Sequence, residues 1–242
     1  MKRNECMTDF KNENGNVLFL ILIAVALFAA LSYAVTNSSR SGGDAGRETT
    51  MINSAVLLQF PASVRTSVMR LVIEGVAVDR QIFDTPGSIP TADERISVFH
   101  PSGGGSIYQQ APGDIMENGN PGSWNFNMNF QIPEVGSSGA GLAGNELIAL
   151  LPGVTQAVCA KVVEEAEIEV DAADTEAVPV TTDVSGSYGD TQDSAFDMTT
   201  VDNTVLVASG STITDALDGK AFGCFRNTAT GDYIFYNVLY EQ

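Results

Sequence analysis

The chain offers few side chains suited to acid–base or nucleophilic chemistry. Its 242 residues include one histidine, His100, so any imidazole base has to be that residue. His100 follows a short apolar stretch and precedes Pro101, and no Gly-x-Ser-x-Gly nucleophile motif accompanies it. One histidine and three cysteines without a Cys-x-x-Cys pair do not make a zinc site. We therefore expect His100 to be a surface or capping residue and the chain to have no catalytic residues.

Carboxylates are abundant, and oxygen ligands are what Ca²⁺ prefers. Asp190, Asp193 and Asp197 lie close together in the sequence, but they do not match the Asp-x-Asp-x-Asp-Gly calcium loop. We interpret them as solvated loop residues and keep them as low-ranking calcium candidates. A hydrolase that uses carboxylates is an alternative, and it predicts two acids facing one cleft about 5–10 Å apart.

The charge balance excludes several classes of protein. The formal net charge is −18, whereas proteins that bind nucleic acid through phosphates carry a basic face. Apolar residues make up 44% and charged residues 17%, which excludes a disordered acidic tail. We therefore expect a folded domain with an acidic surface and no nucleic-acid partner.

A long uncharged segment near the N-terminus predicts a membrane helix. Residues 16–39 contain no charged residue, no proline and no glycine. About 20 apolar residues suffice to cross the hydrocarbon core as a helix. Three basic residues precede the segment and two follow it: Lys2, Arg3, Lys11, Arg40 and Arg47. This bias favours an N-terminus inside the cell and a head in the periplasm or outside.

A cleaved secretory signal is an alternative interpretation of the same segment. Ser32-Tyr33-Ala34 has the small-x-small pattern of a cleavage site. However, the apolar run is long for a signal peptide, and Glu5, Asp9 and Glu13 offset the basic residues of the first 15 positions. An anchor that stays in the membrane is therefore favoured.

The junction between the polar leader and the apolar segment resembles a prepilin leader. Residues 1–15 end in Gly15, and the apolar segment starts at Asn16. The resemblance, to type IV pilins and type II secretion pseudopilins, covers roughly residues 1–60. It implies that a prepilin peptidase cuts after Gly15 and that Asn16 becomes the mature N-terminus.

Two positions depart from the usual pattern of that family. The family usually has an aromatic residue or Met where this chain has Asn16, and Glu where it has Leu20. The K-type minor pseudopilin and some minor pilins also lack that Glu and sit at filament tips, so the resemblance is closest to a minor or tip subunit. The K-type family also binds calcium, but its ligands cannot be matched in this chain. A plain signal anchor with a chance glycine is the alternative.

The cysteines are consistent with export. Cys6 lies in the leader, which leaves Cys159 and Cys224 as an even pair in the exported part. Oxidising compartments outside the cytoplasm permit disulfides, so we expect these two to be bonded. Two buried free thiols are the alternative.

The rest of the chain predicts an α+β fold. Residues 40–47 are rich in glycine and indicate a hinge before a head at 48–242. Apolar residues recur at helical spacing over Glu48–Asp79, and we expect this stripe to be core and Pro61 to kink or restart the helix. A third helical region is expected over 145–163, split at Pro152 with its second helix starting near Thr155.

Short alternating segments in between predict a mostly antiparallel sheet. The strand candidates are Ile96–His100, Gly105–Gln109, Ser123–Ile132, Ile168–Val170, Val178–Thr182, Thr204–Ser209, Ala221–Arg226 and Asp232–Glu241. The last two flank a turn that predicts a hairpin.

These observations favour a structural or assembly protein of the bacterial envelope, without enzymatic activity. The resemblance implies other pilin-like subunits, prepilin peptidase and the inner membrane as partners. The alternative is a membrane-tethered or secreted binding domain with a plain signal anchor.

Overall fold

The computed structural model describes residues 14–38, 42–128, 130–136, 145–170, 177–181, 204–205 and 216–241. The chain divides into two compact units, Met1–Glu48 and Thr49–Gln242. Each unit is described by itself, and the second is called the head unit.

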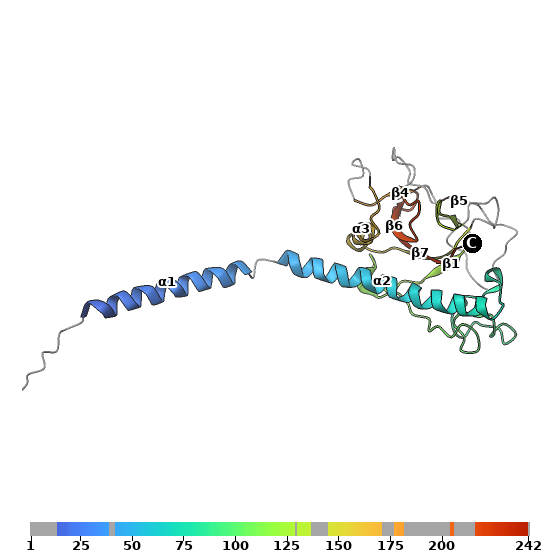
Figure 1. The fold of residues 1–242 in the computed structure, drawn as a ribbon, viewed down its shortest axis with the longest axis horizontal. Coiled ribbons are helices and arrows are strands. Elements are labelled where there is room, and N and C mark those ends of the chain that lie inside the picture. The colour runs from blue at the N-terminus through green and yellow to red at the C-terminus, as the bar shows by residue number, and fades with distance from the viewer. Residues whose placement is uncertain are drawn as a thin grey trace, which may run out of the picture. The chain divides into compact units, whose positions relative to one another are not determined.

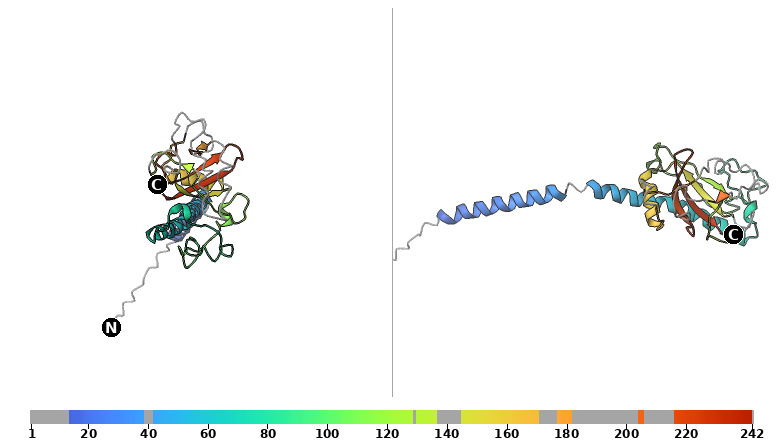
Figure 2. Two further views of the ribbon diagram at one scale, coloured as in Figure 1. Left: turned by 90° about the vertical axis from the view of Figure 1, so that its right-hand side faces the viewer. Right: turned by 90° about the horizontal axis from the view of Figure 1, so that it is seen from above.

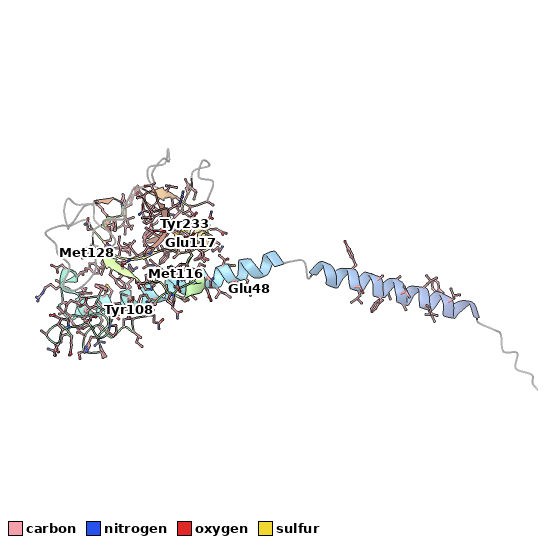
Figure 3. All side chains as sticks on the ribbon, turned by 180° about the vertical axis from the view of Figure 1, so that it is seen from behind. Glu48, Tyr108, Met116, Glu117, Met128 and Tyr233 are labelled. Carbon is pink, nitrogen blue, oxygen red and sulfur yellow. A yellow bond between two sulfur atoms is a disulfide. The ribbon has the colours of Figure 1, made fainter. Side chains whose placement is uncertain are left out.

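Helix α1 covers most of the predicted apolar segment. It runs from Asn14 to Ser38, 25 residues, and so begins just before Gly15. The side chains of Leu18–Tyr33 are all exposed, and nearly all of them are apolar on every side of the helix (Figure 3). A helix that is apolar all round needs an apolar environment on all sides.

Helix α2 spans Gly42–Ile73 and differs from the prediction at two places. Residues 42–47 are helical rather than a hinge, because extending an existing helix avoids the cost of nucleation. The helix also does not restart at Pro61 but continues through this buried residue. Packing of Leu57, Phe60 and Val64 on both sides of the proline compensates for the missing helical hydrogen bond.

The head unit contains a five-stranded sheet with the order β1-β3-β7-β6-β4. Its strands are β1 (Asn125–Asn127), β3 (Leu147–Pro152), β7 (Tyr233–Tyr240), β6 (Phe222–Asn227) and β4 (Val180–Thr181). All neighbours are antiparallel except β4 and β6. A separate parallel pair joins β2 (Phe130–Gln131) to β5 (Thr204–Val205). The described elements therefore confirm an α+β fold with a mostly antiparallel sheet.

Only the second half of the region 145–163, which we predicted to be helical, forms a helix. Leu147–Pro152 is strand β3, paired on both sides with β1 and β7. A short apolar run buried on both faces has no period that separates strand from helix. The second half is helical as expected: α3 spans Gln156–Glu165 with Thr155 at its N-cap.

The C-terminal hairpin is confirmed, whereas several other strand predictions are wrong. Strands β6 and β7 pair from Phe222 with Asn237 to Arg226 with Tyr233, across the predicted turn. Ile96–His100, Gly105–Gln109 and Ile168–Val170 form no strands, and the first contributes only a bridge between Ser97 and Ile82. Short 3₁₀ turns occur at Val78–Arg80 and Gly113–Ile115.

The core of the head unit lies between the inner face of α2 and the sheet (Figures 1 and 2). Phe60 on α2 contacts Trp124 and Phe126 at ring-centroid distances of 5.3 and 6.5 Å. Phe83 stacks on Phe126 at 4.7 Å. Tyr108, labelled in Figure 3, packs edge-on against Phe60 at 6.0 Å. Aromatic side chains from an irregular segment thus complete the core beside the sheet.

Candidate functional site

The surroundings of His100 are those of a turn residue. Its Nδ1 accepts a hydrogen bond from the Ser102 backbone N–H at 3.2 Å. Its Nε2 lies 3.9 Å from Glu94 Oε1, and both side chains are partly exposed. These two contacts, one to a backbone amide and one to a carboxylate, are those of a turn residue.

Cys159 and Cys224 form the predicted disulfide. Cys159 lies on α3 and Cys224 on β6, and their Cα atoms are 5.4 Å apart. Both residues are fully buried. The bond therefore ties the helix to the sheet from within the core rather than presenting a reactive thiol.

The calcium candidates lie outside the part of the chain that the structure describes. This applies to Asp190, Asp193 and Asp197 alike. Within the described ranges, no group of three or more His, Cys, Asp or Glu side chains is placed to hold a metal ion.

Glu146 is an unusual residue that the sequence did not single out. It precedes β3 and is fully buried. Its Oε2 accepts the Ile132 backbone N–H at 2.9 Å, and its own N–H donates to Phe130 O at 3.1 Å. Its Oε1 is buried and has no hydrogen-bond partner among the described residues. Burial raises the pKa of Glu146 to about 7, and the nearby Glu241 carboxylate adds to the rise.

The neighbouring Asn145 strengthens the same connection. Its Nδ2 donates to Met128 O at 2.8 Å, and the residue is fully buried. Asn145 and Glu146 together hold the backbone of Met128, Phe130 and Ile132 against the start of β3. Because the bonds are internal and backbone-directed, we interpret this pair as a structural clamp rather than a ligand site.

The predicted processing residues lie in or beside α1. The backbone at Gly15 and Asn16 is helical, and the Asn16 side chain lies outside the described part.

Two helical stretches bear on membrane attachment. Among residues with described side chains, Glu48–Ile73 is long and apolar enough by length and composition to cross a membrane. Its inner face is part of the head core, however, with Val64 and Val68 fully buried. The apolar stretch Leu18–Tyr33 is shorter but belongs to α1, whose 25 residues extend about 37 Å. Its side chains are all exposed, so α1 has the surface that lipid would cover.

The apolar stripe predicted on the second helix belongs to two faces of α2. Val64, Val68 and Leu71 are buried, as expected for core. The other face carries an exposed or half-buried row, called the outer stripe: Met51, Ala55, Leu58, Ala62, Thr66, Met69 and Ile73. Met51 and Ala55 belong to the apolar series over Glu48–Asp79 that was expected to be core, and for these two exposed residues the expectation is wrong. Both faces share spacings of three and four, so periodicity alone did not separate them.

The C-terminal half of the outer stripe is hollowed into a shallow groove. The groove has a volume of about 580 Å³ and lies along α2 and the residue after it. Its lining residues are Ala62, Arg65, Thr66, Met69, Arg70, Ile73 and Glu74. Its floor is apolar, and Ile73 is 82% exposed. Such a surface suits the docking of another protein segment better than the chemistry of a small substrate.

Comparisons of the chain with protein families, with curated proteins and with solved structures find no match.

Proposed function

We propose that the chain is a membrane-anchored, pilin-like or pseudopilin-like subunit of a bacterial envelope filament or secretion complex. Its role is structural: α1 anchors the chain, and the head unit takes part in assembly outside the cytoplasm. The orientation is N-terminus inside, and a prepilin peptidase removes residues 1–15.

The observation that carries the proposal is the pair of consecutive helices of different character. The side chains of α1 from Leu18 to Tyr33 are apolar on all sides and exposed. Helix α2 has one face buried against an antiparallel sheet, as the spine of an extracytoplasmic domain would. The Gly15-Asn16 junction, in the first turn of α1, is the site at which we propose that processing occurs.

The disulfide supports an extracytoplasmic head. A bond between Cys159 and Cys224 persists in oxidising compartments and is rare in the cytoplasm.

N-terminal sequencing of the protein purified from membranes tests the proposal. The expected start is Asn16, and a Gly15→Lys variant should retain Met1 or residue 2 as its first residue. A natural chain that begins at Met1 would reject processing and favour a plain anchor with a binding head. A start near Val35 or Thr36 would show that the segment is a cleaved secretory signal.

A further inference from the structure

The segment 128–136 is docked on the start of β3 through a buried carboxyl group. Glu146 Oε2 accepts the Ile132 backbone N–H at 2.9 Å, and the Glu146 backbone N–H donates to Phe130 O at 3.1 Å. Glu146, Phe130 and Ile132 are all fully buried. The docking of this segment therefore depends on a titratable group that lies inside the closed structure.

The surroundings of Glu146 favour the neutral form of its carboxyl group. An ionised carboxylate can accept about four hydrogen bonds. Oε2 receives the bond from Ile132, however, and no described residue donates to the buried Oε1. No lysine, arginine or histidine of the described part forms an ion pair with it. Burying an unpaired charge costs much more free energy than burying a neutral acid, so ionisation favours any state in which water reaches Glu146.

The charged groups near Glu146 do not compensate for its ionisation. Glu241 follows β7, and its carboxylate adds to the burial that raises the pKa of Glu146 to about 7. Arg65 on α2 forms an ion pair with Glu241, at 3.4 Å, and not with Glu146. The segment 128–136 carries one titratable residue, Glu134, which is exposed, and β1, β3 and β5 carry none. Ionisation of Glu146 therefore has no cation to stabilise it in the closed arrangement of the described residues.

The segment 128–136 has the features of a part that opens by itself. Strand β2 pairs with β5 over only two residues, whereas β3 and β7 pair over six. Glu134 has a φ of 61°, a left-handed conformation that a non-glycine residue adopts at a cost in free energy, and opening removes this cost. The burial of Phe130 and Ile132 opposes the opening. The open form is therefore a minor state in exchange with the closed one.

We propose that Glu146 is a pH-operated latch, whose protonated form docks the segment 128–136 on β3 and whose ionised form lets this segment open while the five-stranded sheet stays folded. A group whose pKa is raised in the closed state stabilises that state at low pH and loses this effect as the pH rises. The latch is therefore closed at pH 5 and loosened at pH 8. Opening presents the apolar side chains of Phe130 and Ile132, which the closed form covers. The inference goes beyond the proposed assembly role and does not depend on it.

Hydrogen exchange of the full-length chain in detergent micelles tests the latch. The measured quantity is the protection factor, the intrinsic exchange rate at each pH divided by the observed rate. Protection of a peptide covering 130–136 should fall at least about tenfold from pH 5 to pH 8, the effect of one pKa unit remaining after solvent screening. It should also be lower than the protection of Phe222–Asn227 in β6. Below the unfolding transition it should respond less to urea than β6 does, because a local opening exposes less surface than unfolding.

Matched variants assign the effect to Glu146. Glu146→Gln cannot ionise and should keep the protection of 130–136 the same at pH 5 and pH 8. Glu134→Gln removes an exposed carboxyl group from the same segment and should retain the natural fall. Glu241→Gln removes the neighbouring charge and should shift the midpoint of the fall to lower pH. Because the Glu241 side chain is 43% exposed, this last variant tests the latch even if Glu146→Gln does not fold.

Several outcomes would overturn the latch. Protection of 130–136 that equals that of β6 in size and in urea response would mean that Glu146 acts only through global unfolding. Protection that is the same at pH 5 and pH 8 would mean that Glu146 does not control the segment. A fall that persists in Glu146→Gln would assign it to another group, as would a midpoint that Glu241→Gln leaves unchanged. The mature N-terminus is measured separately, so failure of the latch leaves the proposed function untouched.

Discussion

Glu146 Oε2 accepts the Ile132 backbone N–H at 2.9 Å although Glu146 is fully buried. The contact joins the start of β3 to the residue that follows β2. Only one carboxylate oxygen is satisfied in this way, because no described residue gives the buried Oε1 a hydrogen bond. A carboxyl group in these surroundings prefers its neutral form, and its pKa rises from 4.5 to about 7.

This raised pKa predicts that the head unit becomes less stable as the pH rises. The folded state holds the Glu146 proton more tightly than the unfolded state does. The contribution is therefore fully present below about pH 4.5 and is lost as the pH rises to about 7. With allowance for solvent screening, the loss of unfolding free energy should be on the order of 1–3 kcal/mol. Urea denaturation of the protein at pH 5 and pH 8 measures it.

Glu146→Gln isolates the contribution of this one group. The variant should lose most of the difference between pH 5 and pH 8, whereas Glu164→Gln, at an exposed position, should keep it. An unchanged pH difference in Glu146→Gln would mean that other groups cause the dependence.

Two residues near the end of α2 test whether the helix is core on one side only. Leu71 is fully buried, whereas Ile73 is 82% exposed. Leu71→Ala should lower the unfolding free energy by about 2–5 kcal/mol, because it removes packed methyl groups and leaves a cavity. Ile73→Ala should change it by less than about 0.5 kcal/mol. Equal losses in the two variants would contradict the division of α2 into an inner face and an outer stripe.

Gly223 on β6 has no room for a side chain. A Cβ at this position would lie 2.7 Å from Ile168 Cδ1 and 2.9 Å from Tyr236 Cε1. The Tyr236 hydroxyl donates to Lys220 O at 3.0 Å and therefore resists displacement. Gly223→Ala should destabilise the head unit by about 1–3 kcal/mol in thermal or urea unfolding. Adding Ile168→Val should recover part of the loss, and strict additivity of the two changes would argue against the steric explanation.

Prediction from the sequence works best where strand and turn propensities agree with the pairing in the folded structure. Tyr233–Tyr240 and Phe222–Asn227 are β-rich segments joined by a turn, and they form the predicted hairpin. The disulfide was also predictable, because only two cysteines follow the leader. The apolar character of α1 could be predicted from residues 16–39 alone, because they contain no charged residue.

The structural features that could not be predicted from the sequence have physical causes at particular residues. Leu147–Leu151 is buried on both faces of the sheet, so no alternation distinguished it from a helix. Glu146 could not be recognised, because its burial depends on contacts with Phe130 and Ile132 that are distant in the chain. The outer stripe and the core face of α2 have the same periodicity, and only the packed structure separates them.

The disulfide should contribute substantially to the stability of the head unit. It closes a loop of 65 residues between Cys159 and Cys224, which corresponds to roughly 4 kcal/mol in the chain-entropy model. Urea denaturation with and without a reductant should show a loss of this order. Cys159→Ala/Cys224→Ala should start from the lower stability and respond no further to reductant, while Cys6→Ser should behave as the natural chain. A reductant effect that persists in the double variant would assign it to something other than this bond.

The anchoring role of α1 predicts a strong effect of charge at its centre. Ala26 and Ala30 lie inside the apolar helix, and an arginine at the middle of a spanning helix costs about 2.5–3.5 kcal/mol in membrane insertion. Ala26→Arg/Ala30→Arg should therefore shift the protein from the carbonate-resistant membrane pellet to the soluble fraction. Thr230→Arg, which adds charge to an exposed turn, should leave the distribution unchanged. If the double variant stays in the pellet, α1 is not the anchor, and the apolar surface of α2 becomes the next segment to test, because Glu48–Ile73 is also long enough to cross a membrane.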